Sequence, residues 1–170
     1  NALSNSQLSV LETRDVALLS TTQISQLSTR QVSRLSDDQL NALSTTQLVA
    51  MTTAQIVAMT TTQVSAMTSE QLNAMASDDL QAMTTAQVAA LGTSQLSNLA
   101  TAQVALLETA DVAVLGSAQL ASLSDDAISA MTTAQVKVLA TAALNALTST
   151  QLAALETADL ASMTTAQISA

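Results

Sequence analysis

The stretch LSTTQLVAM at residues 43–51 carries the pattern that decides the fold. Met51 follows Leu43 after eight residues, and a Leu or Met recurs at this spacing along the whole chain. We call each eight-residue unit an octad and number its positions from 0, at the Leu or Met, to 7. A fixed short period predicts that one small unit stacks on copies of itself. The position-0 residues are Leu3, Leu11, Leu19, Leu27, Leu35, Leu43, Met51, Met59, Met67, Met75, Met83, Leu91, Leu99, Leu107, Leu115, Leu123, Met131, Leu139, Leu147, Leu155 and Met163.

Other positions of the octad are also restricted. Position 5 is aliphatic in every octad, as in Leu48, and position 2 is always Ser, Thr, Asp or Asn, as in Thr45. Position 4 is Gln in most octads, as in Gln47, with Asp or Ala in the others, and position 7 is often Ala. Each octad therefore supplies two obligatory apolar side chains and a residue of the kind that caps helices.

Three secondary structures can be tested against this period. In one continuous helix, eight residues advance about 800°, so the apolar pair rotates by about 80° per octad and forms no stripe. In a strand, positions 0 and 5 point to opposite faces, and the turns typical of hairpins are missing. A disordered chain would not keep an unbroken aliphatic pair. The remaining interpretation is a helix of little more than one turn in each octad, separated from the next by a capped corner.

Two positions of the octad are candidates for the helix cap. Ser44 and Gln47 have the spacing of a capping box, and Leu43 and Leu48 occupy the positions of a hydrophobic staple. Position 1, however, is Glu, Ala or Gly in some octads, whereas position 2 never leaves the capping set. We therefore expect position 2 to supply the cap oxygen, and we expect Gly92 and Gly116 to lie at the end of the preceding helix.

One octad cannot fold alone, because ordering eight residues costs more backbone entropy than two buried aliphatic side chains return. The sequence thus predicts an all-α solenoid, a superhelix of 21 eight-residue units that are each a very short capped helix. Positions 0 and 5 line its interior, the position-7 alanines seal it, and three or four octads make one superhelical turn. Both ends fall inside the pattern, so we interpret residues 1–170 as a single repeat array cut from a longer one.

Composition excludes most classes of function. The chain has no His, Cys, Trp, Tyr, Phe or Pro, and its net charge is −9. The usual nucleophiles with their bases, soft metal ligands and base-stacking side chains are therefore missing, so we expect no enzyme and no cofactor. A chain this acidic repels phosphate, which argues against nucleic acid, and no apolar run approaches the length needed for membrane insertion. Arg34 and Lys137 are interpreted as solvated charges.

Acidic side chains form the strongest candidates for a binding site. Three octads spell Glu-Thr-x-Asp, and carboxylates three residues apart repel each other unless a cation such as calcium compensates them. Calcium usually takes six or more oxygens, so a solvated surface or a corner cap is the simpler interpretation. The acidic doublets favour helix starts. The candidate metal residues are Glu12, Asp15, Glu108, Asp111, Glu156 and Asp159, and the doublets are Asp37-Asp38, Asp78-Asp79 and Asp125-Asp126.

The position-2 Thr residues offer a second candidate surface. If each lies at the same place in its octad, the hydroxyls form a regular column that could bind ice or a polymer. The alternative is that these hydroxyls cap helices and satisfy backbone donors.

Octads such as MTTAQVAA at residues 83–90 are similar to the Thr-, Ala- and Gln-rich octapeptide arrays of very large bacterial surface or secreted proteins. The resemblance implies a low-complexity, non-catalytic structural segment at the cell surface or outside the cell, working as an elongated, semi-rigid spacer or stalk. Its partners would be flanking repeats and domains of the same polypeptide, with self-association possible. The alternative function is a binding module whose Thr or acidic columns engage ice, a glycan or calcium.

The octad assignment can be tested at two adjacent residues. Val104 at position 5 is expected inside and Ala105 at position 6 outside. Val104→Asp should lower the free energy of unfolding by several kcal/mol because it buries an unpaired charge, whereas Ala105→Asp should have a much smaller effect. Urea unfolding followed by far-ultraviolet circular dichroism measures both, and equal effects would contradict the assignment.

Overall fold

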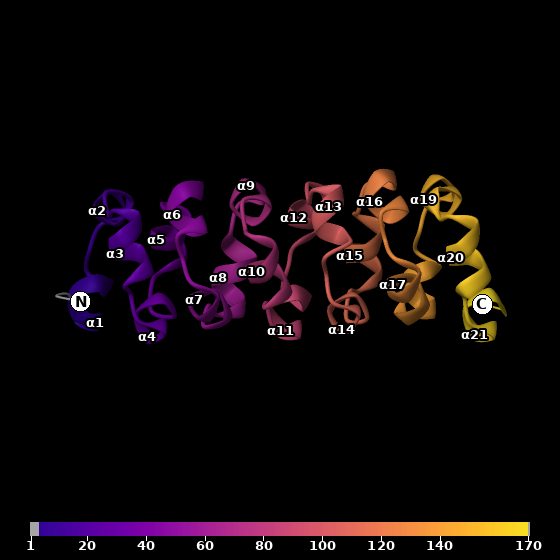
Figure 1. Ribbon diagram of the computed structural model, residues 1–170, viewed down its shortest axis with the longest axis horizontal. Helices are drawn as coiled ribbons and strands as arrows, with labels where there is room; N and C mark the ends of the chain where they lie inside the picture. The colour runs from indigo at the N-terminus through magenta and orange to yellow at the C-terminus, as the bar shows by residue number, and fades with distance from the viewer. Residues whose placement is uncertain (1–3, 170) are drawn as a thin grey trace. The chain divides into compact units, whose positions relative to one another are not determined.

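The computed structural model describes residues 4–169 and leaves Leu3, the first position-0 residue, outside the described part. Within that range the chain forms 21 helices of four to six residues and no strand, so the predicted all-α array of short helices is confirmed (Figure 1). None of these helices is long and apolar enough to cross a membrane. The helices are α1 (Asn5–Ser9), α2 (Thr13–Ala17), α3 (Thr21–Ser25), α4 (Thr29–Val32), α5 (Asp37–Asn41), α6 (Thr45–Val49), α7 (Thr53–Val57), α8 (Thr61–Ala66), α9 (Ser69–Asn73), α10 (Ser77–Gln81), α11 (Thr85–Ala89), α12 (Thr93–Ser97), α13 (Thr101–Val104), α14 (Thr109–Val112), α15 (Ser117–Ala121), α16 (Asp125–Ser129), α17 (Thr133–Val138), α18 (Thr141–Leu144), α19 (Ser149–Ala154), α20 (Thr157–Ser162) and α21 (Thr165–Ser169).

Each helix begins at position 2, and the N-cap is position 1. Ser44 has extended dihedral angles, φ −66° and ψ 159°, and its side-chain oxygen accepts a hydrogen bond from the Gln47 backbone N–H at 3.2 Å. The expectation that position 2 supplies the cap oxygen is therefore wrong. A cap residue has non-helical dihedral angles, whereas position 2 is already the first helical residue.

Position 2 always holds a residue type that caps helices, and this had placed the predicted N-cap one residue too far along the chain. The two glycines share this shift, because Gly92 and Gly116 are N-caps and do not end the preceding helices. Their φ angles are −77° and −75°, which any residue adopts. A Cβ built on Gly116 would meet Gln119 Oε1 at 3.5 Å, an ordinary contact. Neither position needs glycine for its backbone.

The helices end after little more than one turn. In α7, Ala58 at position 7 is the C-cap in the right-handed helical region, and the N–H of Met59 donates to the carbonyl of Ile56 at 3.1 Å. Where position 0 is itself the C-cap its backbone is extended, as at Leu139 with φ −61° and ψ 136°. Alanines at position 7 are half-buried, as at Ala58, whereas a larger side chain such as Leu18 is 83% exposed. The predicted sealing alanines are therefore partly covered.

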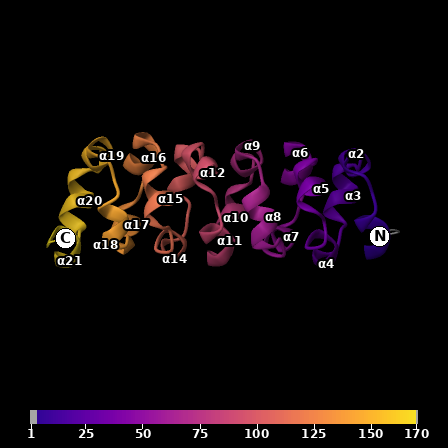
Figure 2. The ribbon, with the colours of Figure 1, turned by 180° about the vertical axis from the view of Figure 1, so that it is seen from behind.

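The chain folds into two compact units, Asn1–Ala90 and Leu91–Ala170, and each has the same internal packing. In the first unit each helix contacts the helix three further along, from α1 with α4 through α8 with α11. In the second the same rule holds from α12 with α15 through α18 with α21. Figure 2 shows the helices from behind, with the first unit in indigo to magenta and the second in pink to yellow. Within each unit a superhelical turn thus contains between three and four octads, as predicted.

Positions 0 and 5 form the interior of both units. Away from the first and last described turns, position-5 side chains are almost completely buried, with exposed fractions of 0% at Val32 and 1% at Val104, and position-0 side chains are nearly as buried, with 4% at Met59. Ala105, next to Val104, is exposed. The inside and outside assignment of the octad is therefore confirmed.

Candidate functional site

The position-4 glutamine is the third residue of its helix and closes the N-terminal capping box. Gln55 Oε1 accepts a hydrogen bond from the Thr52 N–H at 2.7 Å, while the Thr52 side-chain oxygen accepts from the Gln55 N–H at 3.3 Å. Two backbone donors that a helix start leaves without an intrahelical partner are thereby satisfied. This contact holds the amide in one orientation.

The other end of the same amide bonds the preceding turn of the superhelix. Gln55 Nε2 donates to the carbonyl oxygens of Ile24 at 2.9 Å and Leu27 at 2.7 Å, 31 and 28 residues earlier in the chain. Ile24 lies in the last turn of α3 (Thr21–Ser25), and Leu27 begins the next octad. The glutamine therefore satisfies carbonyls at a helix C-terminus, where intrahelical donors run out.

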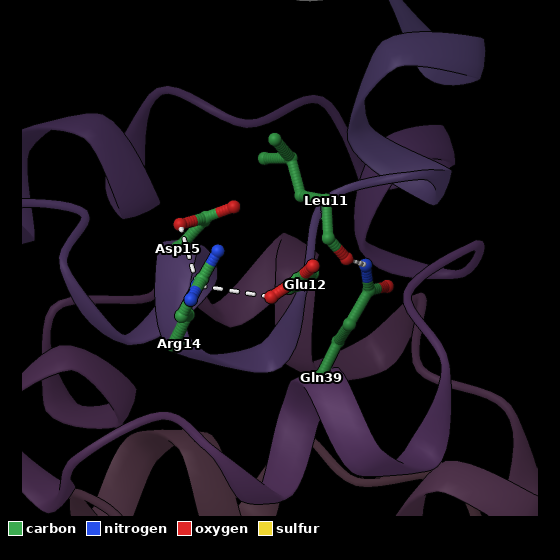
Figure 3. Close-up of polar contacts among 5 residues, drawn as sticks. All are labelled: Leu11, Glu12, Arg14, Asp15 and Gln39. Carbon is green, nitrogen blue, oxygen red and sulfur yellow. Dashed lines mark hydrogen bonds and ion pairs between the residues drawn. The ribbon is translucent and has the colours of Figure 1, made fainter.

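This contact recurs through both units, and we call the set the glutamine ladder. The bond to the position-0 carbonyl spans 28 residues each time, with N···O distances of 2.6 to 2.9 Å. Figure 3 shows the first of these bonds, from Gln39 to Leu11. The ladder includes Gln39, Gln47, Gln55, Gln63, Gln71 and Gln87 in the first unit and Gln119, Gln135, Gln151 and Gln167 in the second.

Glutamine is the side chain that this position requires. The amide provides one acceptor oxygen and two N–H donors, and the octad uses the oxygen for the cap and the nitrogen for two carbonyls. Glu would keep the oxygen but lose the donors, Asn is one methylene shorter, and Met has neither group. Because Gln55 and Gln63 are each only 2% exposed, water cannot replace these bonds.

The first superhelical turn differs because no described turn precedes it. Gln7 and Gln23 make the same capping box, with Oε1 accepting from the N–H of Ser4 and of Ser20 at 2.8 Å. Both side chains are exposed. Exposure of these two amides therefore follows from their place in the stack.

Three octads place a buried Asp at position 4. Asp79, Asp111 and Asp159 are 6%, 3% and 2% exposed. Asp79 Oδ1 accepts from the Thr53 hydroxyl at 2.7 Å, and Asp159 Oδ1 accepts from the Thr133 hydroxyl at 2.8 Å. A carboxylate has no hydrogen to donate to the carbonyls of the preceding turn, so at Asp79 and Asp159 a bond from a position-2 hydroxyl takes the place of the glutamine bonds.

The candidate metal residues do not converge on one point. Glu12 and Asp15 lie on either side of Arg14, whose Nε is 2.9 Å from Glu12 Oε2 and 3.7 Å from Asp15 Oδ1 (Figure 3). An arginine thus compensates the repulsion that had motivated the cation hypothesis. All three side chains of this cluster are largely solvated, so the ion pairs contribute little stability.

In the other two pairs the carboxylates occupy different environments. Glu108 and Glu156 are exposed N-caps, whereas Asp111 and Asp159 are buried at position 4. Asp159 Oδ2 also accepts from the Glu156 N–H at 3.3 Å. Residues 4–169 contain no group of three or more His, Cys, Asp or Glu side chains that could hold a metal ion.

The acidic doublets lie in the first turns of α5, α10 and α16, as predicted from the helix dipole. The position-2 hydroxyls, by contrast, are not the caps that the sequence suggested. Thr45, Thr61 and Thr93 are exposed at the first helical position, and the cap is the preceding residue. Most of the Thr column therefore faces solvent.

Comparison with protein families identifies the repeat. The ALTTAQ repeat matches four overlapping segments, residues 8–45, 41–77, 72–109 and 104–141, which together cover most of the chain. This chain belongs to the ALTTAQ repeat family. The matches start 31 to 33 residues apart, which is close to four octads, so one ALTTAQ repeat corresponds to slightly more than one superhelical turn. Comparisons with curated proteins and with solved structures found no match.

The bond of the glutamine ladder between turns is the functional contact that sequence reasoning missed. The capping box at Ser44 and Gln47 was predicted, but it uses only the amide oxygen. The available signal was chemical, since Glu would close the same box and yet position 4 is Gln in most octads. A preference for the amide over the carboxylate indicates that the two N–H donors are needed as well.

The glutamine ladder predicts a specific pattern of stability. Gln63→Met removes the cap acceptor, leaves the buried carbonyl of Leu35 without its glutamine donor and leaves the Val32 carbonyl with the Leu35 N–H alone, whereas Gln23→Met removes only the cap acceptor. Since one unsatisfied buried group costs about 1–3 kcal/mol, Gln63→Met should lower the free energy of unfolding by about 1–3 kcal/mol more than Gln23→Met. Urea unfolding followed by circular dichroism suits a chain without aromatic residues. Equal losses would mean that the bonds between turns contribute nothing.

In an octad with a buried Asp at position 4, substitution by Gln should change the free energy of unfolding in the opposite direction. Asp79→Gln should raise the free energy of unfolding by about 1–2 kcal/mol, because the new amide reaches the carbonyls of the preceding turn and replaces the single bond from Thr53. Asp79→Asn is the matched control, since it removes the charge but is one methylene too short. A gain of the same size in Asp79→Asn would attribute the effect to the lost charge instead of the restored ladder.

Proposed function

We propose that this ALTTAQ repeat array is a structural, non-catalytic spacer or stalk in a large bacterial protein at the cell surface or outside the cell. The observation that carries the proposal is the glutamine ladder, which joins each turn only to its neighbour in the stack. Contacts of this kind let stability and length grow by addition of octads. The similarity of the octads to the octapeptide arrays of large surface and secreted proteins supports the setting.

Two further features support a spacer over an enzyme. The composition lacks His and Cys, and buried position-4 amides such as Gln55 are engaged in backbone caps and in bonds between turns. The absence of cysteine and the abundance of Ser and Thr are compatible with an extracellular setting. Nucleic acid stays an unsuitable partner for a chain with a net charge of −9.

A spacer must lengthen in regular steps. Inserting a second copy of residues 35–66, which is four whole octads, should increase the maximum dimension in small-angle X-ray scattering by a fixed amount, and a third copy should add the same amount again. Helix content per residue should not change. The control duplicates residues 35–38 alone, which shifts the phase by half an octad and should lower stability. Insertions of whole octads that leave the dimension unchanged or unfold the chain would defeat the spacer function.

A second candidate function is binding through the Thr column, and the exposure of Thr45, Thr61 and Thr93 favours it. Its test is ice recrystallisation inhibition, a glycan-binding screen and calorimetric titration with calcium. A spacer gives no response in any of the three. A response that Thr45→Lys and Thr61→Lys remove would establish the binding module, whereas a calcium response lost in Glu108→Gln would assign it to the acidic pairs.

A further inference from the structure

The second unit contains four consecutive octads whose N-cap residues make no side-chain hydrogen bond to their helices. These N-caps, at the starts of α12, α13, α14 and α15, are Gly92, Ala100, Glu108 and Gly116. Elsewhere in residues 4–169, N-caps of this kind occur singly, at Glu12, Ala76, Ala140 and Glu156. Because four octads complete a superhelical turn, we call residues 91–122 the uncapped turn.

An N-cap side chain satisfies a backbone donor at the start of its helix. In the octad that follows the uncapped turn, Ser124 Oγ accepts a hydrogen bond from the Ala127 N–H at 3.1 Å. A methyl group or a hydrogen atom cannot accept this bond, and the Glu108 carboxylate does not accept it. Ser and Thr at the N-cap stabilise a helix clearly over Ala and slightly over Gly. The largest losses of stability in the uncapped turn therefore lie at Ala100 and Glu108.

The glutamine ladder is also interrupted at the uncapped turn. Ala127 and Ala143 are the two alanines at position 4 of this chain. The 28-residue step of the ladder leads from them back to Leu99 and Leu115, which both belong to the uncapped turn. The octads are neighbours, since α13 contacts α16 and α15 contacts α18. Because a methyl group has no hydrogen to donate, neither carbonyl can receive the ladder bond.

The ladder bonds that do form alternate with these two interruptions. Leu91 accepts from Gln119 Nε2 at 2.7 Å, and Leu107 accepts from Gln135 Nε2 at 2.8 Å. Apolar burial is complete all the same, with exposed fractions of 0% at Leu96 and at Leu120. The uncapped turn is therefore held mainly by apolar burial and has fewer of the directional bonds that fix a helix start and join it to the adjacent turn.

We propose that the uncapped turn opens reversibly as one segment while the rest of the second unit stays folded. A stack in which each turn contacts only its neighbours permits such local opening, because the contacts that are lost are confined to adjacent turns. The helices that are released are too short to persist alone. Residues 91–122 are then the part of the second unit that lengthens first under load. The inference rests on caps and bonds inside the second unit and is independent of the proposed spacer function.

Hydrogen exchange of the full chain, measured by mass spectrometry, tests the proposal. Residues 43–74 are a matched reference, since they are also four octads and each has a Ser or Thr cap. Residues 123–138, with caps at Ser124 and Thr132, are the reference inside the second unit. Protection factors in the uncapped turn should be about tenfold or more below those of both references. Exchange that is no faster in residues 91–122 than in the references would overturn the proposal.

Restoring a cap tests the cause of the opening. Ala100→Ser should raise the protection of the uncapped turn by about fivefold, because it supplies the missing acceptor. Ala105→Ser is the matched control at the exposed position 6 of the same octad, where Ser65 stands in another octad. Glu108→Ser should act like Ala100→Ser, whereas Glu108→Gln, which removes only the charge, should not. Cap variants that leave exchange unchanged, or controls that slow it equally, would contradict the proposal.

Restoring a ladder bond is an independent test. Ala143→Gln places an amide where other octads carry one, so it should donate to the Leu115 carbonyl and raise the protection of the uncapped turn by about fivefold. Ala142→Gln, at the exposed neighbouring residue, is the control and should have no effect. A gain confined to residues 139–146 would mean that the new amide only caps its own helix, and it would refute the part that the missing ladder bond plays in the opening.

Discussion

The two hydrogen bonds from a position-4 glutamine to the preceding turn are the interaction on which the structure depends. Helices of four to six residues are far too short to be stable alone, because nucleation fixes several residues for each bond gained. Every such helix also leaves backbone groups at both ends without intrahelical partners. One amide satisfies the start of its own helix and the end of an earlier one, so local capping and packing between turns become a single requirement.

Apolar burial and the glutamine hydrogen bonds contribute to the fold in different ways. The pairs at positions 0 and 5 supply the hydrophobic free energy, with exposed fractions such as 0% at Val88 and 3% at Leu91. That term is non-directional and would tolerate sliding of one turn over another. The bonds from Gln55 to Ile24 and Leu27 are directional and fix which octads face each other. At Asp79, where position 4 cannot donate, a hydrogen bond from the Thr53 hydroxyl of the preceding turn accompanies the apolar burial.

Much of this fold could be read from the sequence, because the period and the buried positions follow from side-chain chemistry within one octad. Val104 inside, Ala105 outside and the doublet Asp37-Asp38 at a helix start are all local consequences. The N-cap was placed one residue late, since side-chain type at Thr45 was weighed above the spacing from Ser44 to Gln47. The ladder could not be located, because its partners lie 28 and 31 residues away and that separation depends on the superhelix. The candidate metal residues differ in how deeply they are buried, and the sequence of one octad does not reveal that difference.

The restriction of contacts to adjacent turns has a mechanical consequence. Under tension, a turn at the edge of a unit shares one interface with its neighbour, so it can peel away while the turns behind it keep their bonds. Each detached turn releases its contour length and remains tethered beside the surface it left. When the load falls, the detached turn can pack again on the adjacent turn, to which it is still joined. We therefore expect such a stack to yield stepwise under load instead of rupturing in one event.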